Sequence, residues 1–195
     1  MSNLDDASLS VHRYVERYGL QAFIETGCYV GSGLGAADRW RLELFSCDLN
    51  QGHVERCKTL FPNARVYFTD SSSFLRDVCP HVRKPTLFWL DAHFPRKASD
   101  ERQRWPLFDD LHAVKELKPD VERDVILCDD IRCIAGEDNP RYRPGEDEHV
   151  NTEHSLCEYI AIFADTHDVE IIHQETGVLA FRPRLPAPAE SKRID

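Results

Sequence analysis

The stretch FIETGCYVGSGLG, residues 23–35, decides the fold of this chain. Glu25 ends an apolar run at its start. Four glycines precede a segment compatible with a helix: Gly27, Gly31, Gly33 and Gly35. Glycine adopts positive φ without strain and lets a ligand approach the backbone closely, and a helix N-terminus presents N–H groups without partners inside the helix. The stretch therefore predicts a strand, a tight turn and a helix start that hold a nucleotide-type cofactor.

The bulk composition limits the function classes. The 195 residues, 42% of them hydrophobic, suffice for one domain with a full core. We expect that domain over residues 1–183, with a flexible tail at 184–195. A formal net charge of −10 argues against binding nucleic acid or an anionic membrane, because phosphates need clustered cations. With no apolar window near the ~18 residues of a membrane span and no signal-peptide pattern, we expect a cytoplasmic protein.

Cysteine usage indicates a reduced protein. The seven cysteines are an odd set without CxxC spacing. This pattern favours neither a disulfide framework nor a zinc ribbon. Most lie in apolar runs, so we expect buried core thiols.

The chain alternates strand-like and helix-like segments. We expect parallel strands at residues 21–26, 42–47, 65–69, 86–90 and 124–128, and a closing hairpin at 169–173 and 178–181. Helices are expected within 1–19 and at 33–41, 51–60, 74–79, 105–117 and 153–166. Such alternation requires right-handed crossovers. The predicted fold class is α/β, a Rossmann-like, doubly wound, mainly parallel seven-stranded sheet with a C-terminal antiparallel hairpin.

An acidic residue ends each of the five expected parallel strands. These residues are Glu25, Asp48, Asp70, Asp91 and the pair Asp129 and Asp130. In open parallel sheets, ligands bind beyond the carboxyl ends of the strands. The sequence therefore predicts a ring of carboxylates along one edge of the sheet.

The glycine spacing selects among nucleotide ligands. Gly27, Gly31 and Gly33 give GxxxGxG instead of the dinucleotide fingerprint GxGxxG, and no lysine follows in the Walker-A position. An acidic residue followed by GxxxGxG after the first strand resembles the class I S-adenosylmethionine-dependent methyltransferases. The resemblance spans residues 23–181 and includes the closing hairpin.

This resemblance implies S-adenosylmethionine as the cofactor. The residues it assigns to cofactor binding are Glu25, Gly27, Tyr29, Gly31, Gly33, Asp48, Asp70 and Ser71. Glu25 and the glycine turn would contact the amino-acid part, and Asp70 with Ser71 would lie beside the adenine. Asp48 would accept hydrogen bonds from both ribose hydroxyls, since an ionised carboxylate is an acceptor only. Taken alone, Asp48 or Asp70 would be interpreted as a strand-end or helix-cap residue; the glycine motif upstream favours the cofactor role.

Asp91, Asp129 and Asp130 follow two strands expected at the centre of the sheet. Carboxylates held close together repel one another unless a cation or protons neutralise them, and oxygen ligands select a hard ion such as Mg²⁺. The placement is similar to that in metal-dependent O-methyltransferases of the catechol and macrolide-sugar types. That similarity implies a metal that binds two acceptor oxygens and lowers a hydroxyl pKa. The alternative is that Asp129 or Asp130 caps the next turn.

The segments FWLDAHF (88–94), WPLFDDLHAV (105–114) and VILCDDIR (125–132) also resemble uncharacterised bacterial methyltransferase-like proteins. The catalytic candidates are Asp91 and His93, the latter as general base or extra metal ligand. Catechol-type enzymes have a lysine where this chain has Phe94, so the base does not transfer from them. A structural role for His93 is the alternative.

Two polar segments, residues 94–105 and 135–151, are predicted substrate-side loops. Their cations, including Arg96 and Arg102, would either bind an anionic acceptor or form a solvated surface. The leading hypothesis is metal-assisted O-methylation of a small hydroxylated acceptor, such as a sugar or natural-product intermediate. The alternatives are a metal-dependent phosphoesterase that uses the Asp/His edge and a non-catalytic methyltransferase-like binding module. The oligomeric state stays open, a homodimer being one option.

Overall fold

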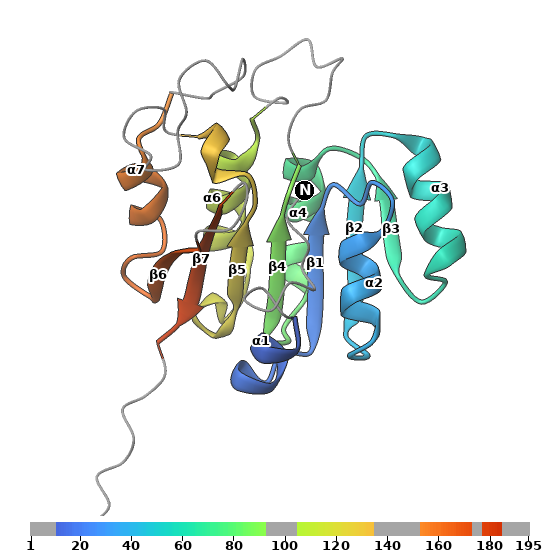
Figure 1. Ribbon diagram of the computed structural model, residues 1–195, viewed down its shortest axis with the longest axis horizontal. Coiled ribbons are helices and arrows are strands. Elements are labelled where there is room, and N and C mark those ends of the chain that lie inside the picture. Colours follow the sequence, from blue (N-terminus) through green and yellow to red (C-terminus); the bar gives the residue numbers. More distant parts are fainter. Residues whose placement is uncertain (1–10, 93–104, 135–152, 173–176, 185–195) are drawn as a thin grey trace, which may run out of the picture.

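A computed structural model of the chain describes residues 11–92, 105–134, 153–172 and 177–184. The strands are β1 Ala22–Thr26, β2 Glu43–Asp48, β3 Arg65–Phe68, β4 Thr86–Leu90, β5 Val125–Cys128, β6 His167–Ile172 and β7 Val178–Pro183. They form one seven-stranded sheet in the order β3-β2-β1-β4-β5-β7-β6 (Figure 1). The first five strands pair in parallel, and β7 is antiparallel to both β5 and β6. The fold class is the one predicted.

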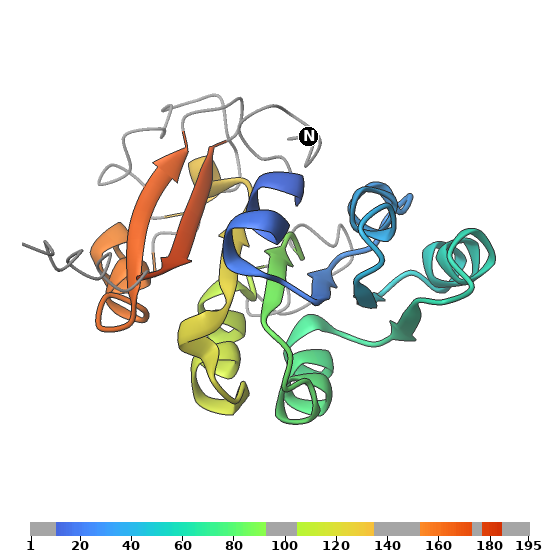
Figure 2. The ribbon, with the colours of Figure 1, turned by 90° about the horizontal axis from the view of Figure 1, so that it is seen from below.

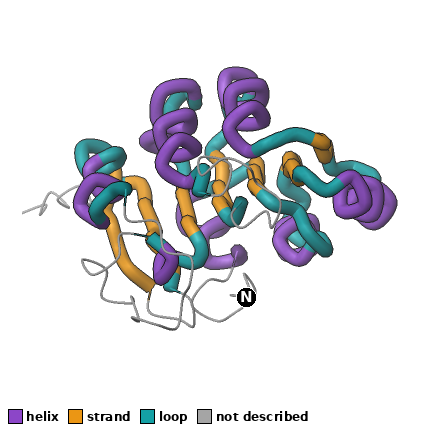
Figure 3. Tube along the Cα trace, turned by 90° about the horizontal axis from the view of Figure 1, so that it is seen from above, coloured by secondary structure: helices purple, strands orange, loops and turns teal. Residues whose placement is uncertain are grey.

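Helices cover both faces of this sheet. They are α1 Val11–Tyr18, α2 Ser32–Asp38, α3 Gln51–Leu60, α4 Ser71–Val78, α6 Leu107–Leu117 and α7 Leu156–Ala161. Short 3₁₀ turns lie at η1 Cys79–His81, η2 Val121–Arg123 and η3 Ile131–Cys133. In the end-on views, α1, α2 and α3 lie on one side of the sheet and α4, α6 and α7 on the other (Figures 2 and 3). No helix in the described ranges is long and apolar enough to span a bilayer.

The core consists of two apolar layers, one on each face. Alternate strand residues point to opposite faces: Phe23 and Leu87 pack in the layer of α1, α2 and α3, whereas Ile24 and Phe88 pack in the layer of α4, α6 and α7. All five residues of β4 are buried, as a strand at the centre of a covered sheet requires.

Side-chain caps set the helix starts. The Asn50 side chain accepts from Gly52 N–H at 2.9 Å, and α3 has the predicted bounds. The Asp70 side chain accepts from Ser73 N–H at 2.8 Å, so α4 begins at Ser71 instead of the predicted residue 74. Ser71, Ser72 and Ser73 therefore lie inside the first turn of the helix.

The C-terminal strand is longer than the sequence suggests. β7 continues through Arg182, which forms an ion pair with Glu170 at 2.8 Å, to Pro183. The Arg184 guanidinium donates to the carbonyls of Ala164 and Asp165 at 2.6 and 3.0 Å. The chain is therefore held to the body up to residue 184, and residues 185–195 lie outside the described part.

Six of the seven cysteines are buried free thiols, and Cys157 is exposed. Burial raises the pKa of the Cys47 and Cys128 thiols well above the usual range. These thiols are core side chains, as predicted.

A buried ion pair holds the edge of the sheet where the parallel strands begin. Lys118 Nζ lies 3.1 Å from Asp124 Oδ2, and the two side chains are 1% and 0% exposed. Lys118 also donates to the carbonyls of Lys84 and Pro119, at 3.2 and 3.1 Å. Thr86 N–H donates to Asp124 Oδ1 at 2.7 Å. The pair thus joins the end of α6 to the starts of β4 and β5.

Candidate functional site

The glycine turn between β1 and α2 needs its glycines for backbone geometry and packing. Gly27 and Gly31 have φ values of +85° and +86°, a region that side chains rarely adopt. A Cβ on Gly27 would lie 2.9 Å from the carbonyl oxygen of Asp91, and a Cβ on Gly31 would lie 2.7 Å from the Phe61 ring. Gly33 is buried within α2. The first two glycines therefore let the turn pack tightly against the protein itself.

Backbone hydrogen bonds hold this turn against the end of β2. Gly27 N–H and Cys28 N–H donate to the carbonyl of Cys47 at 3.0 and 2.9 Å. Tyr29, at φ +42°, directs its N–H to Asp48 Oδ2 at 2.9 Å, and its side chain is exposed. The turn and the predicted ribose carboxylate thus form one unit.

The Asp48 carboxylate lies at the surface end of that unit. It is 13% exposed, Asn50 N–H donates to Oδ1 at 2.8 Å, and His53 Nδ1 lies 3.1 Å from Oδ2. A carboxylate offers about four acceptor positions, and Asn50 N–H is the one donor that the described residues direct to Oδ1. His53 was not among the site residues predicted from the sequence, although its place in the first turn of the helix that follows Asp48 was a usable signal.

Glu25, one of the strand-end acids predicted to form a ring of carboxylates, is buried within the sheet. It is 2% exposed within β1, and the Ser46 hydroxyl donates to its Oε2 at 2.8 Å. Burial, with smaller contributions from the charges of Asp91 and Asp48, raises the pKa of Glu25 to about 8. Burial therefore favours the protonated form of Glu25. Its predicted contact with the cofactor stays a prediction.

A buried carboxyl that the sequence analysis missed connects α4 with α6. Asp110 is 1% exposed, and the hydroxyls of Ser71 and Ser72 each donate to its Oδ1 at 3.0 Å. Burial raises the pKa of Asp110 to about 7. The sequence spacing could have predicted this burial. Leu107, Asp110 and Val114 are spaced i, i+3, i+7, which places Asp110 on the face that an amphipathic helix buries.

Mild acidification is expected to stabilise the protein. The pKa of Glu25 is about 8 against an ordinary 4.5, and that of Asp110 is about 7 against 3.8. At pH values between the ordinary and the raised pKa of each group, the folded chain binds more protons than the unfolded chain. The free energy of unfolding therefore falls as pH rises through that range. The slope is at most about 1.4 kcal/mol per pH unit for each group. Urea denaturation at several pH values from about 5 to about 9 measures it.

Glu25→Gln and Asp110→Asn are the matched variants, because each keeps an acceptor oxygen for its serine partners and removes the titration. Each is expected to flatten the slope in its own window. Wild-type stability that rises with pH through this range would contradict the assignment.

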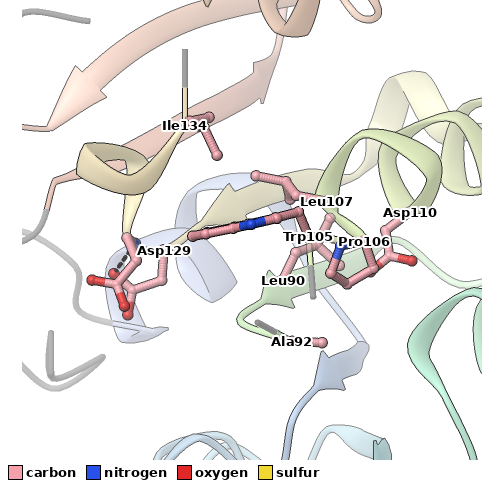
Figure 4. Close-up of a pocket in the computed structure, with 9 residues that line it drawn as sticks. Leu90, Ala92, Trp105, Pro106, Leu107, Asp110, Asp129 and Ile134 are labelled. Carbon is pink, nitrogen blue, oxygen red and sulfur yellow. Dashed lines mark hydrogen bonds between the residues drawn. The ribbon is translucent and has the colours of Figure 1, made fainter. Parts of the chain in front are cut away.

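A pocket opens where β4 and β5 end and α6 begins (Figure 4). Its apolar walls are Leu90, Ala92, Pro106, Leu107 and Ile134, together with the indole of Trp105. Its polar lining is Asp110, Asp129 and Asp130. In Figure 4 the indole extends from the start of α6 toward Asp129. The end of β4 is fixed by Thr26 Oγ1, which accepts from the N–H groups of Asp91 and Ala92 at 3.2 and 3.3 Å.

The aspartates predicted to bind a metal meet at this edge but do not assemble a metal site among the described residues. Asp129 N–H donates to the Leu90 carbonyl at 3.1 Å, which extends the hydrogen bonding between β4 and β5 by one residue. Asp129 Oδ1 accepts from Asp130 N–H at 2.7 Å. Within the described ranges, no three His, Cys, Asp or Glu side chains are grouped so that they could hold an ion. His93 and the two predicted substrate-side loops, apart from Trp105, lie outside these ranges. A metal stays a prediction.

Comparisons with known proteins identify the fold. No family model and no curated protein matches the chain. S-adenosylhomocysteine-bound methyltransferase PaMTH1 of Podospora anserina matches at 16% identity, with a TM-score of 0.62 over 94% of this chain and 80% of that one. A putative caffeoyl-CoA O-methyltransferase from Staphylococcus aureus matches at 9% identity, with a TM-score of 0.60 over 88% of this chain and 80% of that one. S-adenosylmethionine-bound CalS10, an amino pentose methyltransferase from Micromonospora echinaspora, matches at 12% identity, with a TM-score of 0.59 over 94% of this chain and 92% of that one. At these identities the likeness establishes a shared fold.

Proposed function

We propose that this chain, which has the fold of the class I S-adenosylmethionine-dependent methyltransferases, transfers a methyl group from S-adenosylmethionine to a small molecule. The observation that carries the proposal is the hydrogen bond from Tyr29 N–H to Asp48 Oδ2 at 2.9 Å. It joins the glycine turn after β1 to the carboxylate that ends β2, at the edge of the sheet where ligands of such folds bind.

The residues around Asp48 fit the donor's nucleoside. Asp48 Oδ1 retains acceptor capacity for ribose hydroxyls. Leu49 and Phe68, which end or follow the neighbouring strands, are large exposed apolar side chains suited to an adenine ring. We assign Asp70 and Ser71 to the adenine side as well. When bound, S-adenosylmethionine would supply a sulfonium-activated methyl group. The acceptor oxygen would take this group and give up its proton, and S-adenosylhomocysteine would remain.

The acceptor side of the proposal uses the pocket at the ends of β4 and β5. A small hydroxylated molecule, such as a sugar or natural-product intermediate, would lie between Trp105 and Asp129. His93, next in the chain after the pocket residue Ala92, is the candidate that takes the hydroxyl proton. Asp91 precedes them and is the second catalytic candidate.

Metal assistance is a separate part of the proposal. The described carboxylates alone do not fit an ion, and none of the residue roles above depends on one. If magnesium assists, a chelator is expected to lower the transfer rate at least about tenfold, and Mg²⁺ is expected to restore it. Asp129→Asn should abolish that restoration. A rate that is indifferent to chelator and Mg²⁺ would remove the metal.

A binding screen tests the cofactor. S-adenosylhomocysteine is expected to raise the melting temperature, because a ligand at about 100 times its Kd stabilises the native state by about 2.7 kcal/mol. NAD at the same concentration is expected to leave it unchanged. A shift with NAD and none with S-adenosylhomocysteine would overturn the proposal.

A further inference from the structure

The Asp48 carboxylate at the end of β2 already has several polar partners within the chain. Tyr29 N–H donates to Oδ2 at 2.9 Å, and His53 Nδ1 lies 3.1 Å from the same oxygen. The Cys28 thiol is a weaker contact, at 3.8 Å from Oδ2. Asn50 N–H donates to Oδ1 at 2.8 Å. These groups come from the glycine turn and from the start of α3, which lie at the same edge of the sheet as the end of β2 (Figure 1).

The partners of Asp48 use its two oxygens unequally. Each oxygen of a carboxylate offers about two acceptor positions. Among the described residues, Tyr29 N–H and His53 Nδ1 take both positions on Oδ2, whereas Asn50 N–H takes one position on Oδ1. Asp48 therefore has room for one further strong donor, on Oδ1. A ribose carries two neighbouring hydroxyls, so this room suits one of them.

The His53 ring is held in place by both of the segments that meet at Asp48. An ionised carboxylate only accepts hydrogen bonds, so the ring donates from a protonated Nδ1. The Tyr29 ring stands perpendicular to it, with centroids 5.0 Å apart and an interplanar angle of 88°. The backbone N–H of His53 donates to the Asn50 carbonyl at 3.0 Å in the first turn of α3. The contact with Asp48 is thus formed in the chain without a ligand.

This contact restricts the rotation of the carboxylate. The terminal torsion of an aspartate is broad, so the group turns readily unless its oxygens are held. Tyr29 N–H and His53 Nδ1 together hold Oδ2, and Oδ1 stays the oxygen with acceptor capacity. A group that is already ordered costs less entropy when a ligand binds to it. Loss of the imidazole would leave Tyr29 N–H as the one strong donor on Oδ2 from the described residues.

We propose that His53 is a positioning residue of the methyl-donor site: it locks Oδ2 of Asp48, so that Oδ1 alone binds the donor, through a single ribose hydroxyl. The inference rests on the proposed function, because that function supplies the ribose. It narrows the expectation that Asp48 binds both hydroxyls. In this role His53 acts through Asp48 and not by contact with the donor.

Matched variants test the positioning role by isothermal titration calorimetry with S-adenosylhomocysteine. His53→Ala is expected to lower the affinity about tenfold, the effect of one hydrogen bond. His53→Asn should restore it to within about twofold, because an amide nitrogen on the same Cβ can donate to Oδ2 in place of Nδ1. His81→Ala, which changes an exposed histidine in η1, should bind as wild type does. An affinity that stays or rises in His53→Ala, or that His53→Asn fails to restore, would overturn the inference.

The 2′-deoxy and 3′-deoxy forms of S-adenosylhomocysteine test the single hydroxyl. For the form that lacks the hydroxyl bound by Asp48, His53→Ala should cost no further affinity, because the energies of coupled groups are not additive. For the other form the substitution should still cost about tenfold. A purely structural loss would lower the affinity of all three ligands equally. Equal losses for the two deoxy forms, full or partial, would contradict the proposal.

NMR of the ligand-free chain keeps this inference distinct from the proposed function. With ¹⁵N-labelled histidine, the neutral His53 ring is expected to carry its proton on Nδ1, and Asp48→Ala should remove this preference. A proton on Nε2 would overturn the locking contact, whatever the chain binds. If wild type binds none of the three ligands, methyl transfer fails and the positioning role falls with it. If S-adenosylhomocysteine binds and His53→Ala has no effect, the positioning role alone is wrong.

Discussion

Replacing Asp48 with alanine is expected to weaken S-adenosylhomocysteine binding by about 100-fold or more. The variant loses the acceptor proposed for the ribose hydroxyls, and each hydrogen bond to a charged group contributes about 1.5–3 kcal/mol. It also loses the carboxylate that receives Tyr29 N–H at 2.9 Å and Asn50 N–H at 2.8 Å. The glycine turn therefore loses one of its hydrogen bonds to the end of β2, while those from Gly27 N–H and Cys28 N–H to the Cys47 carbonyl remain. Isothermal titration calorimetry with wild type and variant measures the change.

Two further variants separate binding from folding. Asp48→Asn keeps an acceptor oxygen but no charge, so its affinity should fall between wild type and Asp48→Ala. Asp77→Ala removes an exposed acid from α4 and should bind as wild type does. Urea denaturation of each variant shows whether the chain stays folded at the titration temperature. A folded Asp48→Ala variant with wild-type affinity would remove Asp48 from the cofactor site.

Replacing Lys118 with alanine is expected to lower the free energy of unfolding by about 3–5 kcal/mol, the range for leaving one member of a buried ion pair uncompensated. Lys118 and Asp124 are 1% and 0% exposed, and their charged atoms lie 3.1 Å apart. The substitution would leave the Asp124 carboxylate without its cation. It would also remove the donor to the carbonyls of Lys84 and Pro119. Urea denaturation of wild type and variant measures the loss.

An ion pair with one largely exposed partner provides the control. Lys115 Nζ lies 2.6 Å from Asp165 Oδ1, but the Asp165 side chain is largely open to solvent. Lys115→Ala should cost at most about 1 kcal/mol, because solvent screens such pairs. Adding Asp124→Asn to a Lys118→Met chain should recover part of the loss, since the unpaired charge is then gone. Equal losses for Lys118→Ala and Lys115→Ala would show that burial does not govern the energetics of this pair.

The periodic parts of the sequence predicted the sheet well. β4 and α3 have the predicted bounds because their signals are local: Pro85 precedes a nearly all-apolar strand, and Asn50 caps the helix. Helix ends were less predictable. α7 ends at Ala161, five residues before the expected end, although Ser155 and Glu158 form a complete capping box at its start. A cap fixes where a helix starts, while tertiary packing contributes to where it ends.

The opening stretch at residues 23–35 determined by itself that a strand, a glycine turn and a helix follow one another, because positive φ at Gly27 and Gly31 is a local property of glycine. The tertiary structure alone decided which groups meet around them. The Ser71 hydroxyl reaches Asp110 across 39 residues, and Glu25 becomes a buried partner of Ser46 across 21. The cost of burying a carboxyl depends on the neighbours that packing brings to it from distant segments, and these neighbours are not adjacent in the chain.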